Sequence, residues 1–264
     1  MDLGLGGRWA LITGGSKGIG RAIANELAAE GCNLHLAART RHDLESAAGE
    51  IAMRFEVRVM IHSGDLSTAE GVAALADGVG AVDILVNNAG SVPRGSLIEV
   101  DERKWRASWD LKVFSYINLS RALYPAMCER GRGVIINVIG IGGERPDANY
   151  IAGSTANAAL MMFTRSLGGD SIRHGVRVVG VNPGPTETEK YVGDMERLAI
   201  ERLGDKSRWR DLLAALPMRR AATSDEVAGV VAFLASDRAG YISGTIFTVD
   251  GGILSDSALG VKRR

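Results

Sequence analysis

The sequence predicts an α/β fold, a three-layer, doubly wound parallel sheet of about seven strands in a single domain over residues 1–264. Short, almost wholly apolar runs alternate with longer segments of helical periodicity, which is typical of parallel strands covered on both faces. A glycine-rich turn follows the first apolar run. No repeat, low-complexity tract or flexible linker divides the chain, and its length suits one core.

Each expected element follows from its local pattern. In the first helix, Ile19, Ile23 and Leu27 recur every four residues, which predicts one buried helical face. Ser67 and Glu70 have the spacing of a capping box at the start of the third helix. The expected strands are 8–15, 33–39, 57–66, 82–90, 133–140, 176–185 and 245–252. The expected helices are 17–31, 42–55, 67–79, 101–130, 150–167 and 224–236.

Residues 187–220 interrupt this alternation, because charged helical turns replace the next strand and helix. Insertions near strand tips commonly serve as lids or binding elements. We therefore expect a substrate-loop insertion at about 187–220, with Tyr191, Trp209 and Leu216 as apolar walls of a pocket. A solvated excursion without a binding role is the alternative.

Composition excludes several classes of protein. The 31 Lys and Arg residues balance the 31 Asp and Glu residues, so no net field attracts nucleic acid or an anionic membrane. Cys32 and Cys128 are far apart and show no metal-binding spacing, which favours free thiols in a reducing compartment. The N-terminus lacks a signal-peptide layout, and no apolar run reaches membrane-spanning length. We expect a cytoplasmic protein with a small-molecule substrate and no metal.

The loop "TGGSKGIG" at 13–20 predicts a dinucleotide site, because it follows the first strand and opens the first helix. Gly14 permits a tight turn, Gly18 lets the backbone approach a pyrophosphate, and Gly20 lets helix and strand pack closely. The helix N-terminus adds free N–H groups and a positive dipole end. The other loop residues expected at the cofactor are Ser16, Lys17 and Ile19.

The end of the second strand indicates which dinucleotide binds. Sites for NAD typically place a carboxylate there to hold the ribose hydroxyls. This strand ends "LAARTR", with Ala38 in the acid's place and Arg39 beside it, and Lys17 lies in the glycine loop. Two cations without an acid suit a 2′-phosphate, so NADP(H) is favoured over NAD(H).

Several motifs together resemble the short-chain dehydrogenase/reductase family: "TGGSKGIG", "GDL" at 64–66, "NNAG" at 87–90, "NPGPTET" at 182–188 and "YISGTIFTVDGG" at 241–252. The resemblance covers nearly the whole chain. It implies a seven-stranded Rossmann sheet, a nicotinamide dinucleotide and, as is usual in the family, a homotetramer or a homodimer. The further cofactor-binding residues that it implies are Asp65, Leu66, Asn87, Ala89, Gly90, Pro183, Gly184, Thr186 and Thr188.

The active site of that family consists of Asn, Ser, Tyr and Lys. Its Tyr exchanges a proton with the substrate oxygen, and its Lys, four residues later, lowers the pKa of that Tyr and binds the nicotinamide ribose. The Ser hydrogen-bonds the substrate oxygen, and the Asn supports a water relay. In this chain the residue four positions after Tyr150 is Ser154, which carries no charge.

Other positions depart from the family pattern as well. Gly140 stands where the Ser is expected, and Lys112 stands where the family usually has Asn. An ungapped alignment from Gly140 places Gly153 at the Tyr position and Asn157 at the Lys position. On that alignment Tyr150 lies one helical turn before the usual tyrosine.

Three hypotheses remain open for the chemistry. In the first, Tyr150 exchanges the proton, Lys112 reaches across from a neighbouring helix as the activating cation, and Asn157 binds the ribose by hydrogen bonds. In the second, the protein binds NADP(H) without turnover, as a sensor or partner subunit. In the third, water or the substrate supplies the proton. The candidate catalytic residues are Tyr150, Lys112, Ser154 and Asn157.

The sequence thus predicts an NADP(H)-dependent oxidoreductase that interconverts a carbonyl and an alcohol by hydride transfer. A 3-oxoacyl-thioester reductase is the second enzyme hypothesis, because the framework regions of those enzymes are similar. A dinucleotide-binding regulatory protein with little or no turnover is the alternative from a different class.

Overall fold

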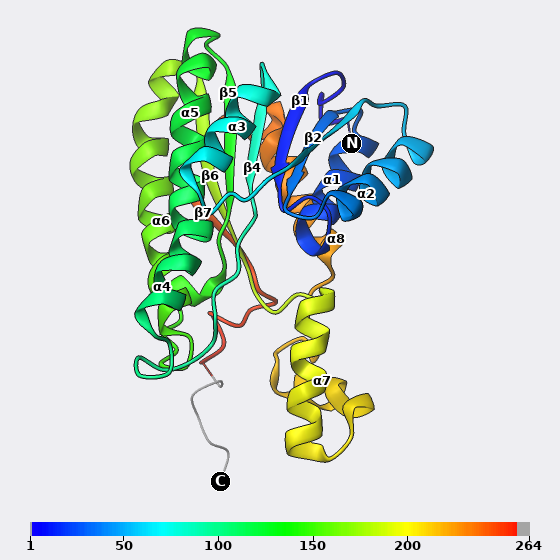
Figure 1. The fold of residues 1–264 in the computed structure, drawn as a ribbon, viewed down its shortest axis with the longest axis vertical. Helices are drawn as coiled ribbons and strands as arrows, with labels where there is room; N and C mark the ends of the chain where they lie inside the picture. Colours follow the sequence, from blue (N-terminus) through cyan, green and yellow to red (C-terminus); the bar gives the residue numbers. More distant parts are fainter. Residues whose placement is uncertain (1, 258–264) are drawn as a thin grey trace.

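A computed structural model describes residues 2–257, and its centre is a sheet of seven parallel strands in the order β3-β2-β1-β4-β5-β6-β7 (Figure 1). The strands are β1 (Trp9–Thr13), β2 (Asn33–Ala38), β3 (Val59–Ser63), β4 (Ile84–Asn87), β5 (Gly133–Val138), β6 (Val176–Pro183) and β7 (Ile246–Val249). The α-helices are α1 (Gly18–Ala29), α2 (Arg41–Arg54), α3 (Ala69–Val79), α4 (Glu102–Trp109), α5 (Ser115–Glu129), α6 (Ile151–Ser171), α7 (Glu189–Leu203) and α8 (Ser224–Ala235). Shorter helical segments are η1 (Asp110–Phe114), η2 (Ile141–Gly143), η3 (Ile172–His174), η4 (Lys206–Ala215) and η5 (Asp237–Ala239).

Helices cover both faces of the sheet, as the apolar strands require. Ala10 and Ile12 of β1 belong to a core shared with α1, α2 and α8. Leu11, between them, faces the opposite side and packs in a core shared with α3 and α5. Because successive strand residues point to opposite faces, a strand buried on both sides must be apolar throughout. The predicted fold class is confirmed.

The strand order creates a crevice at the carboxyl ends of the central strands, between β1 and β4. β1 pairs with β2 on one side and with β4 on the other, and the chain winds outward from this point in both directions. The loops that follow β1 and β4 therefore diverge at the carboxyl ends of the strands. Open α/β sheets bind their ligands at such a switch point.

The helix expected over 101–130 is interrupted. A π-helical turn, η1, separates α4 from α5 and contains Lys112. Such single turns hold an extra residue and often occur at functional sites. The expected capping box at Ser67 and Glu70 is wrong, because Thr68 is the N-cap of α3 and accepts from the amide of Gly71.

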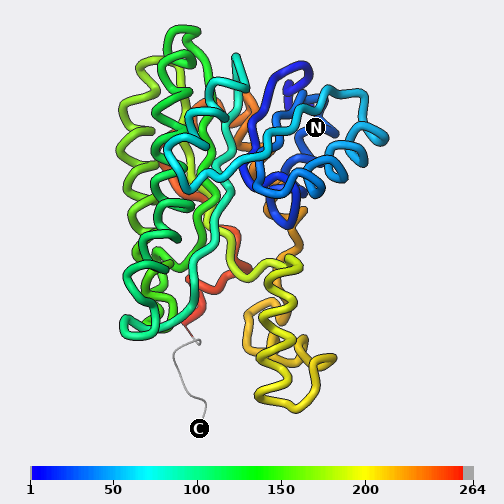
Figure 2. The backbone as a smooth tube through the Cα atoms, in the orientation of Figure 1, coloured from blue at the N-terminus to red at the C-terminus, as the bar shows by residue number. Residues whose placement is uncertain are grey.

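The segment between β6 and α8 forms a helical excursion of its own, which leaves the body and returns to it (Figure 2). Its helices, α7 and η4, enclose a small core that includes Ala199, Trp209 and Leu213. The expectation that Trp209 and Leu216 wall a pocket is wrong, because both pack inside this unit. A unit that projects from the sheet needs its own apolar core to remain folded.

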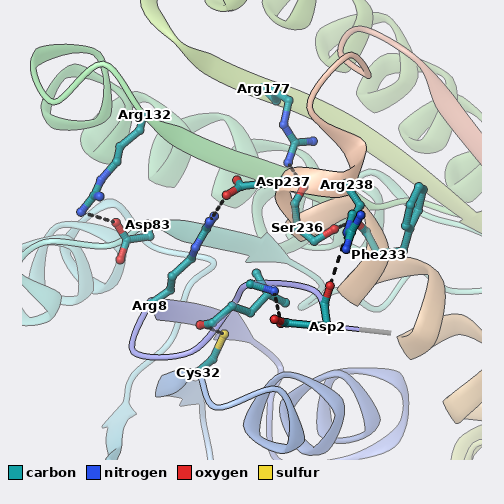
Figure 3. A network of polar contacts seen from close by, with 12 residues as sticks. Asp2, Arg8, Cys32, Asp83, Arg132, Arg177, Phe233, Ser236, Asp237 and Arg238 are labelled. Carbon is teal, nitrogen blue, oxygen red and sulfur yellow. Dashed lines mark hydrogen bonds and ion pairs between the residues drawn. The ribbon is translucent and has the colours of Figure 1, made fainter.

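Ion pairs link the loops at the opposite end of the sheet, where the strands begin (Figure 3). Arg8, before β1, pairs with Asp237, and Arg132, before β5, pairs with Asp83. Arg177 of β6 is buried and donates to the carbonyl of Ser236. This network ties the strand starts to the end of α8, away from the switch point. Within residues 2–257 no helix combines the length and apolarity needed to cross a bilayer.

Candidate functional site

The loop between β1 and α1 is a cradle that only glycines can form. Gly14 has φ +67° and Gly18 has φ +54°, a left-handed conformation that glycine adopts without strain. A Cβ on Gly20 would lie 2.2 Å from the carbonyl oxygen of Gly14. The loop therefore carries no side chain at these glycines where α1 begins, so its backbone fits a pyrophosphate at a helix N-terminus.

The loop after β4 forms the facing wall. The hydroxyl of Thr13 accepts from the amides of Asn88 and Ala89 at 2.9 and 3.0 Å, which fixes the two loops together. Asn88, Ala89 and Gly90 line a groove of about 430 Å³ with Gly14 and the helix start. The sequence had indicated Asn87 here, but its buried amide donates to Ser120 and Asn137 beneath the groove. Asn88 is the asparagine on the groove wall.

The predicted adenosine end of the groove carries charged groups. Lys17 is exposed, and its ammonium lies 3.0 Å from the Asp43 carboxylate, which raises the pKa of Lys17. Asp65 accepts hydrogen bonds from the amide and hydroxyl of Ser67, and with the charge of Arg39 these lower the pKa of Asp65. Among the other residues expected here, Leu66 is buried in the core and Ser16 is half-buried.

A second cavity, of about 710 Å³, adjoins the groove. It lies between the loop after β5, the start of α6, the loop after β6 and the first turns of α7. Gly184 and Thr186, expected at the nicotinamide end, line it, and Tyr191 of α7 lines it as expected. The walls common to groove and cavity are Ile19, Ile139, Gly140, Pro183, Thr188 and Lys190.

Tyr150 lies in this cavity because Gly153 has no side chain. Tyr150 is the N-cap of α6, and its ring folds back over the first turn of the helix. A Cβ on Gly153 would lie 2.0 Å from the Cζ atom of Tyr150. The ring of Tyr150 therefore fills the space where a side chain at 153 would begin. Burial raises the pKa of Tyr150, and the nearby charge of Arg94 opposes that rise.

Asn157 lies on the next turn of α6 and lines the same cavity. Its side chain is 2 % exposed, and its Oδ1 atom is buried without a hydrogen-bond partner. Its Nδ2 atom lies 3.3 and 3.2 Å from the positions that Cβ atoms on Gly140 and Gly142 would take. Buried polar atoms are normally paired, so the Oδ1 atom of Asn157 keeps an unused capacity to accept a hydrogen bond.

Lys112 lies across the shared wall from Tyr150. It lines the groove, and its Nζ atom donates to the carbonyl of Ile139 at 3.0 Å. Burial of the ammonium lowers the pKa of Lys112 to about 8, and the charge of Lys190 adds to this. Ser154 lines neither space, and its Oγ atom is buried without a partner. Of the four catalytic candidates, Tyr150 and Asn157 share the cavity.

Sequence reasoning missed Arg94. Its guanidinium carbon lies 5.4 Å from the centroid of the Tyr150 ring, and it lines the cavity. Arg94 follows the "NNAG" loop, and no local motif marks it. Its role depends on a contact with Tyr150 that forms only in the folded chain. Lys190, also missed, donates to the hydroxyl of Ser91 and borders both spaces.

Comparisons with known proteins agree with this geometry. Residues 8–196 match the family model for short chain dehydrogenases. The chain is 33% identical over 256 residues to the acetoacetyl-CoA reductase of Allochromatium vinosum, covering 93% of this chain and 98% of that protein. It is 36% identical over 251 residues to the 3-oxoacyl-[acyl-carrier-protein] reductase of Escherichia coli, covering 94% and 97%.

A solved structure is similar over almost the whole fold. The L-sorbose reductase of Gluconobacter frateurii, complexed with NADPH and L-sorbose, superposes with a TM-score of 0.92. The two chains are 36% identical, and the match covers 97% of this chain and 100% of that one. The glycine cradle and the strand order agree with these relatives. The chain therefore belongs to the short-chain dehydrogenase/reductase family and is an NAD(P)-dependent oxidoreductase.

Proposed function

We propose that the protein is an NADP(H)-dependent reductase that interconverts a carbonyl and an alcohol, with Tyr150 as the proton-exchanging residue. The observation that carries this proposal is the position of Tyr150 and Asn157 in a cavity that shares walls with the glycine groove. A dinucleotide held in the groove would end at this shared wall. The substrate carbonyl would then lie between the dinucleotide and the phenol of Tyr150.

The chain's own residues supply binding and proton transfer. The bound cofactor would provide the hydride and accept it in the reverse direction. In reduction, the hydroxyl of Tyr150 gives its proton to the substrate oxygen, while the Nδ2 atom of Asn157 donates a hydrogen bond to the same oxygen or to the ribose. The buried ammonium of Lys112 borders the groove and adds positive charge there. Stabilising the oxygen while charge develops on it is a large part of such catalysis.

Two cations support the preference for NADP(H). Lys17 and Arg39 lie at the ends of the loop and strand where a 2′-phosphate would bind, and the similar sorbose reductase is complexed with NADPH. Asp43 already pairs with Lys17, so a 2′-phosphate would share that ammonium with a carboxylate. In this proposal Arg39 contributes the larger part of the discrimination.

Two substrate classes follow from the relatives. A 3-oxoacyl thioester is favoured by the similarity to acetoacetyl-CoA reductase and to the acyl-carrier-protein reductase. A small polar ketone such as L-sorbose is favoured by the structural similarity and by the charged lining of the cavity, which includes Arg94, Arg145 and Asp147. The polar lining leads us to place the small polar ketone first.

Cofactor titration and a substrate panel test the proposal. Intrinsic tryptophan fluorescence follows the binding of NADPH and of NADH, and tighter NADPH binding is expected. Loss of NADPH absorbance is then followed with L-sorbose and with acetoacetyl-CoA, for wild type and Tyr150→Phe. We expect wild type to turn over, and we expect the kcat of Tyr150→Phe to be lower by roughly a hundred- to ten-thousand-fold. Tight NADPH binding without turnover of any ketone would favour the regulatory hypothesis instead.

We propose that residues 187–220 act as the substrate loop. Lys190, Tyr191 and Asp194 of α7 line the cavity, so movement of this unit would change access to Tyr150. Limited proteolysis with and without NADPH tests the role, and protection of α7 by the coenzyme is expected.

We also propose a homotetramer or homodimer. Phe114 of η1 and Met162 of α6 are 48% and 60% exposed, and both elements cover the same side of the sheet. Exposed apolar residues gathered on adjoining helices favour association. Light scattering tests this, and charged substitutions at both positions should give monomers.

A further inference from the structure

The loop after β4 is bonded to the start of α6, and this contact brings Arg94 to Tyr150. Gly95 and Tyr150 form a parallel β-bridge, and the amide of Gly95 donates to the carbonyl of Asn149 at 2.7 Å. Gly95 has φ +142°, and a Cβ there would lie 2.9 Å from a methyl group of Val100, so this position requires glycine. The backbone on both sides of the Arg94–Tyr150 contact is therefore fixed.

The two side chains meet in a defined geometry. The Arg94 guanidinium carbon lies 5.4 Å from the Tyr150 ring centroid, which is within the range of a cation–π contact. Arg94 opposes the effect of burial on the pKa of Tyr150, and also on that of Tyr191, which enters the cavity from α7. The charge of Arg94 thus acts on two phenols that line the same cavity.

Other charged groups around Tyr150 define the field that it experiences. Asp147 lies in the loop before α6. Its Oδ2 atom is 3.7 Å from the Nη1 atom of Arg94, so it offsets part of the charge of Arg94. From α7, Lys190 and Asp194 line the same cavity, and Asp194 pairs with Arg197. Lys112 lies across the wall formed by Ile139 and Gly140 and lines the groove instead.

We propose that Arg94 is the positioning residue of Tyr150, replacing the cation that the α6 helix lacks one turn after the tyrosine. Its guanidinium holds the ring over Gly153 and stabilises the phenolate. This inference rests on the proposed function, in which the Tyr150 O–H bond breaks and its proton forms a new O–H bond on the substrate oxygen. The phenolate beside Arg94 then regains a proton from water in the open cavity.

Direct titration of the phenol tests the proposal without turnover. With tyrosine labelled at Cζ, the resonance missing from Tyr150→Phe identifies Tyr150 among the five tyrosines. Arg94→Ala should raise the pKa of Tyr150, because it removes the positive charge that opposes the effect of burial. Asp147→Asn should lower it, because it frees the charge of Arg94. Arg94→Lys should stay close to wild type, and Arg145→Ala, which removes a cation from the same cavity, should shift it less than Arg94→Ala.

Opposite signs for Arg94→Ala and Asp147→Asn cannot arise from a purely structural role. An unchanged titration in Arg94→Ala, or shifts of the same sign in both variants, would overturn the proposal. Circular dichroism over the same pH range reports whether each variant remains folded.

Turnover gives a second, independent reading. Arg94→Ala should lower kcat about tenfold with a smaller change in KM, and Arg94→Lys should recover most of the loss. Equal kcat in wild type and Arg94→Ala would overturn the inference even where alkaline unfolding hides the titration. If Tyr150→Phe retains wild-type turnover, the proposed function fails, and the phenol titration alone still decides whether Arg94 acts on Tyr150.

Discussion

The cofactor side and the substrate side of the site are built differently. Around the β1–α1 loop the site is backbone, shaped by Gly14, Gly18 and Gly20. Around α6 the site is formed by side chains. The ring of Tyr150 lies over Gly153 and lines the cavity. A backbone site depends on residues at fixed positions, whereas a side-chain site can be formed from a neighbouring turn when a glycine leaves room.

The largest expected effect concerns Gly153. Gly153→Ala adds a Cβ 2.0 Å from Cζ of Tyr150, so the ring must leave its place. We expect kcat to fall about a hundred- to ten-thousand-fold, as when a general acid is lost, while NADPH affinity changes little. Steady-state kinetics and fluorescence titration measure the two effects.

The matched control for this variant is Gly169→Ala in the same helix, where no atom lies within 4 Å of the new Cβ. It should keep wild-type kcat and gain about 0.5–1 kcal/mol of stability. Normal turnover in Gly153→Ala would mean that the position of the Tyr150 ring does not matter.

The cofactor side should respond in the opposite manner. Gly20→Ala places a Cβ 2.2 Å from the Gly14 carbonyl oxygen and 2.5 Å from Nδ2 of Asn88. Relieving this overlap must open the cradle, at a cost of about 1–3 kcal/mol. We expect NADPH affinity to fall by about a hundredfold, measured by calorimetry.

Gly49→Ala is the control for that variant, because it lies in α2 with nothing within 4 Å of the added Cβ. Its coenzyme affinity should equal that of wild type. Unchanged affinity in Gly20→Ala would argue against the glycine cradle as the dinucleotide site.

Lys112 lines the cofactor groove and donates to Ile139 in the wall that the groove shares with the cavity, and it should show a trade-off between stability and activity. Burial lowers the pKa of Lys112 to about 8 from 10.5, so the folded protein holds this charge at a cost. Lys112→Met should raise the free energy of unfolding at neutral pH by roughly 1–3 kcal/mol and lower kcat about tenfold. Thermal melts and kinetics on one preparation measure both changes.

The direction in which stability changes with pH tests the role of Lys112 more sharply. Between pH 8 and 10.5 the unfolded chain still holds the Lys112 proton that the folded protein has released, so wild-type stability should rise with pH in that window. Lys112→Met should lack this contribution. A variant that is less stable and fully active would contradict both the burial cost and the functional role.

The smallest expected effect lies under the cofactor side. His35 of β2 and His62 of β3 lie 2.9 Å apart, Nδ1 to Nε2. Burial, with the charge of His62, lowers the pKa of His35 to about 4 from 6.5, and burial lowers that of His62. The unfolded chain therefore gains protons first as pH falls, and stability present above pH 6.5 should be lost toward pH 4.

His35→Gln can still hydrogen-bond but does not titrate in this range, so it should lose less stability on acidification. We expect a difference of a few degrees in Tm between neutral and acidic buffer. An equal acid loss in wild type and His35→Gln would show that this pair does not couple the stability of the cofactor side to pH.

The fold could be predicted from the sequence because its signals are local. Apolar runs, helical periodicity and the loop "TGGSKGIG" each report on a few consecutive residues, and parallel strands buried on both faces leave few other arrangements. Strand ends shifted by one to a few residues, since periodicity marks the middle of an element better than its limits. The π-helical turn at Lys112 had no local signal.

By itself, the sequence determined the sheet, the glycine cradle and the absence of a lysine one turn after Tyr150. Only the tertiary structure decided that Tyr150 lies over Gly153, that Asn87 packs below the groove while Asn88 lines it, and that Arg94 rather than Lys112 faces the phenol. The reason is physical: glycine loops are set by backbone conformation within a few residues. Contacts between side chains of distant loops depend on how the whole core packs.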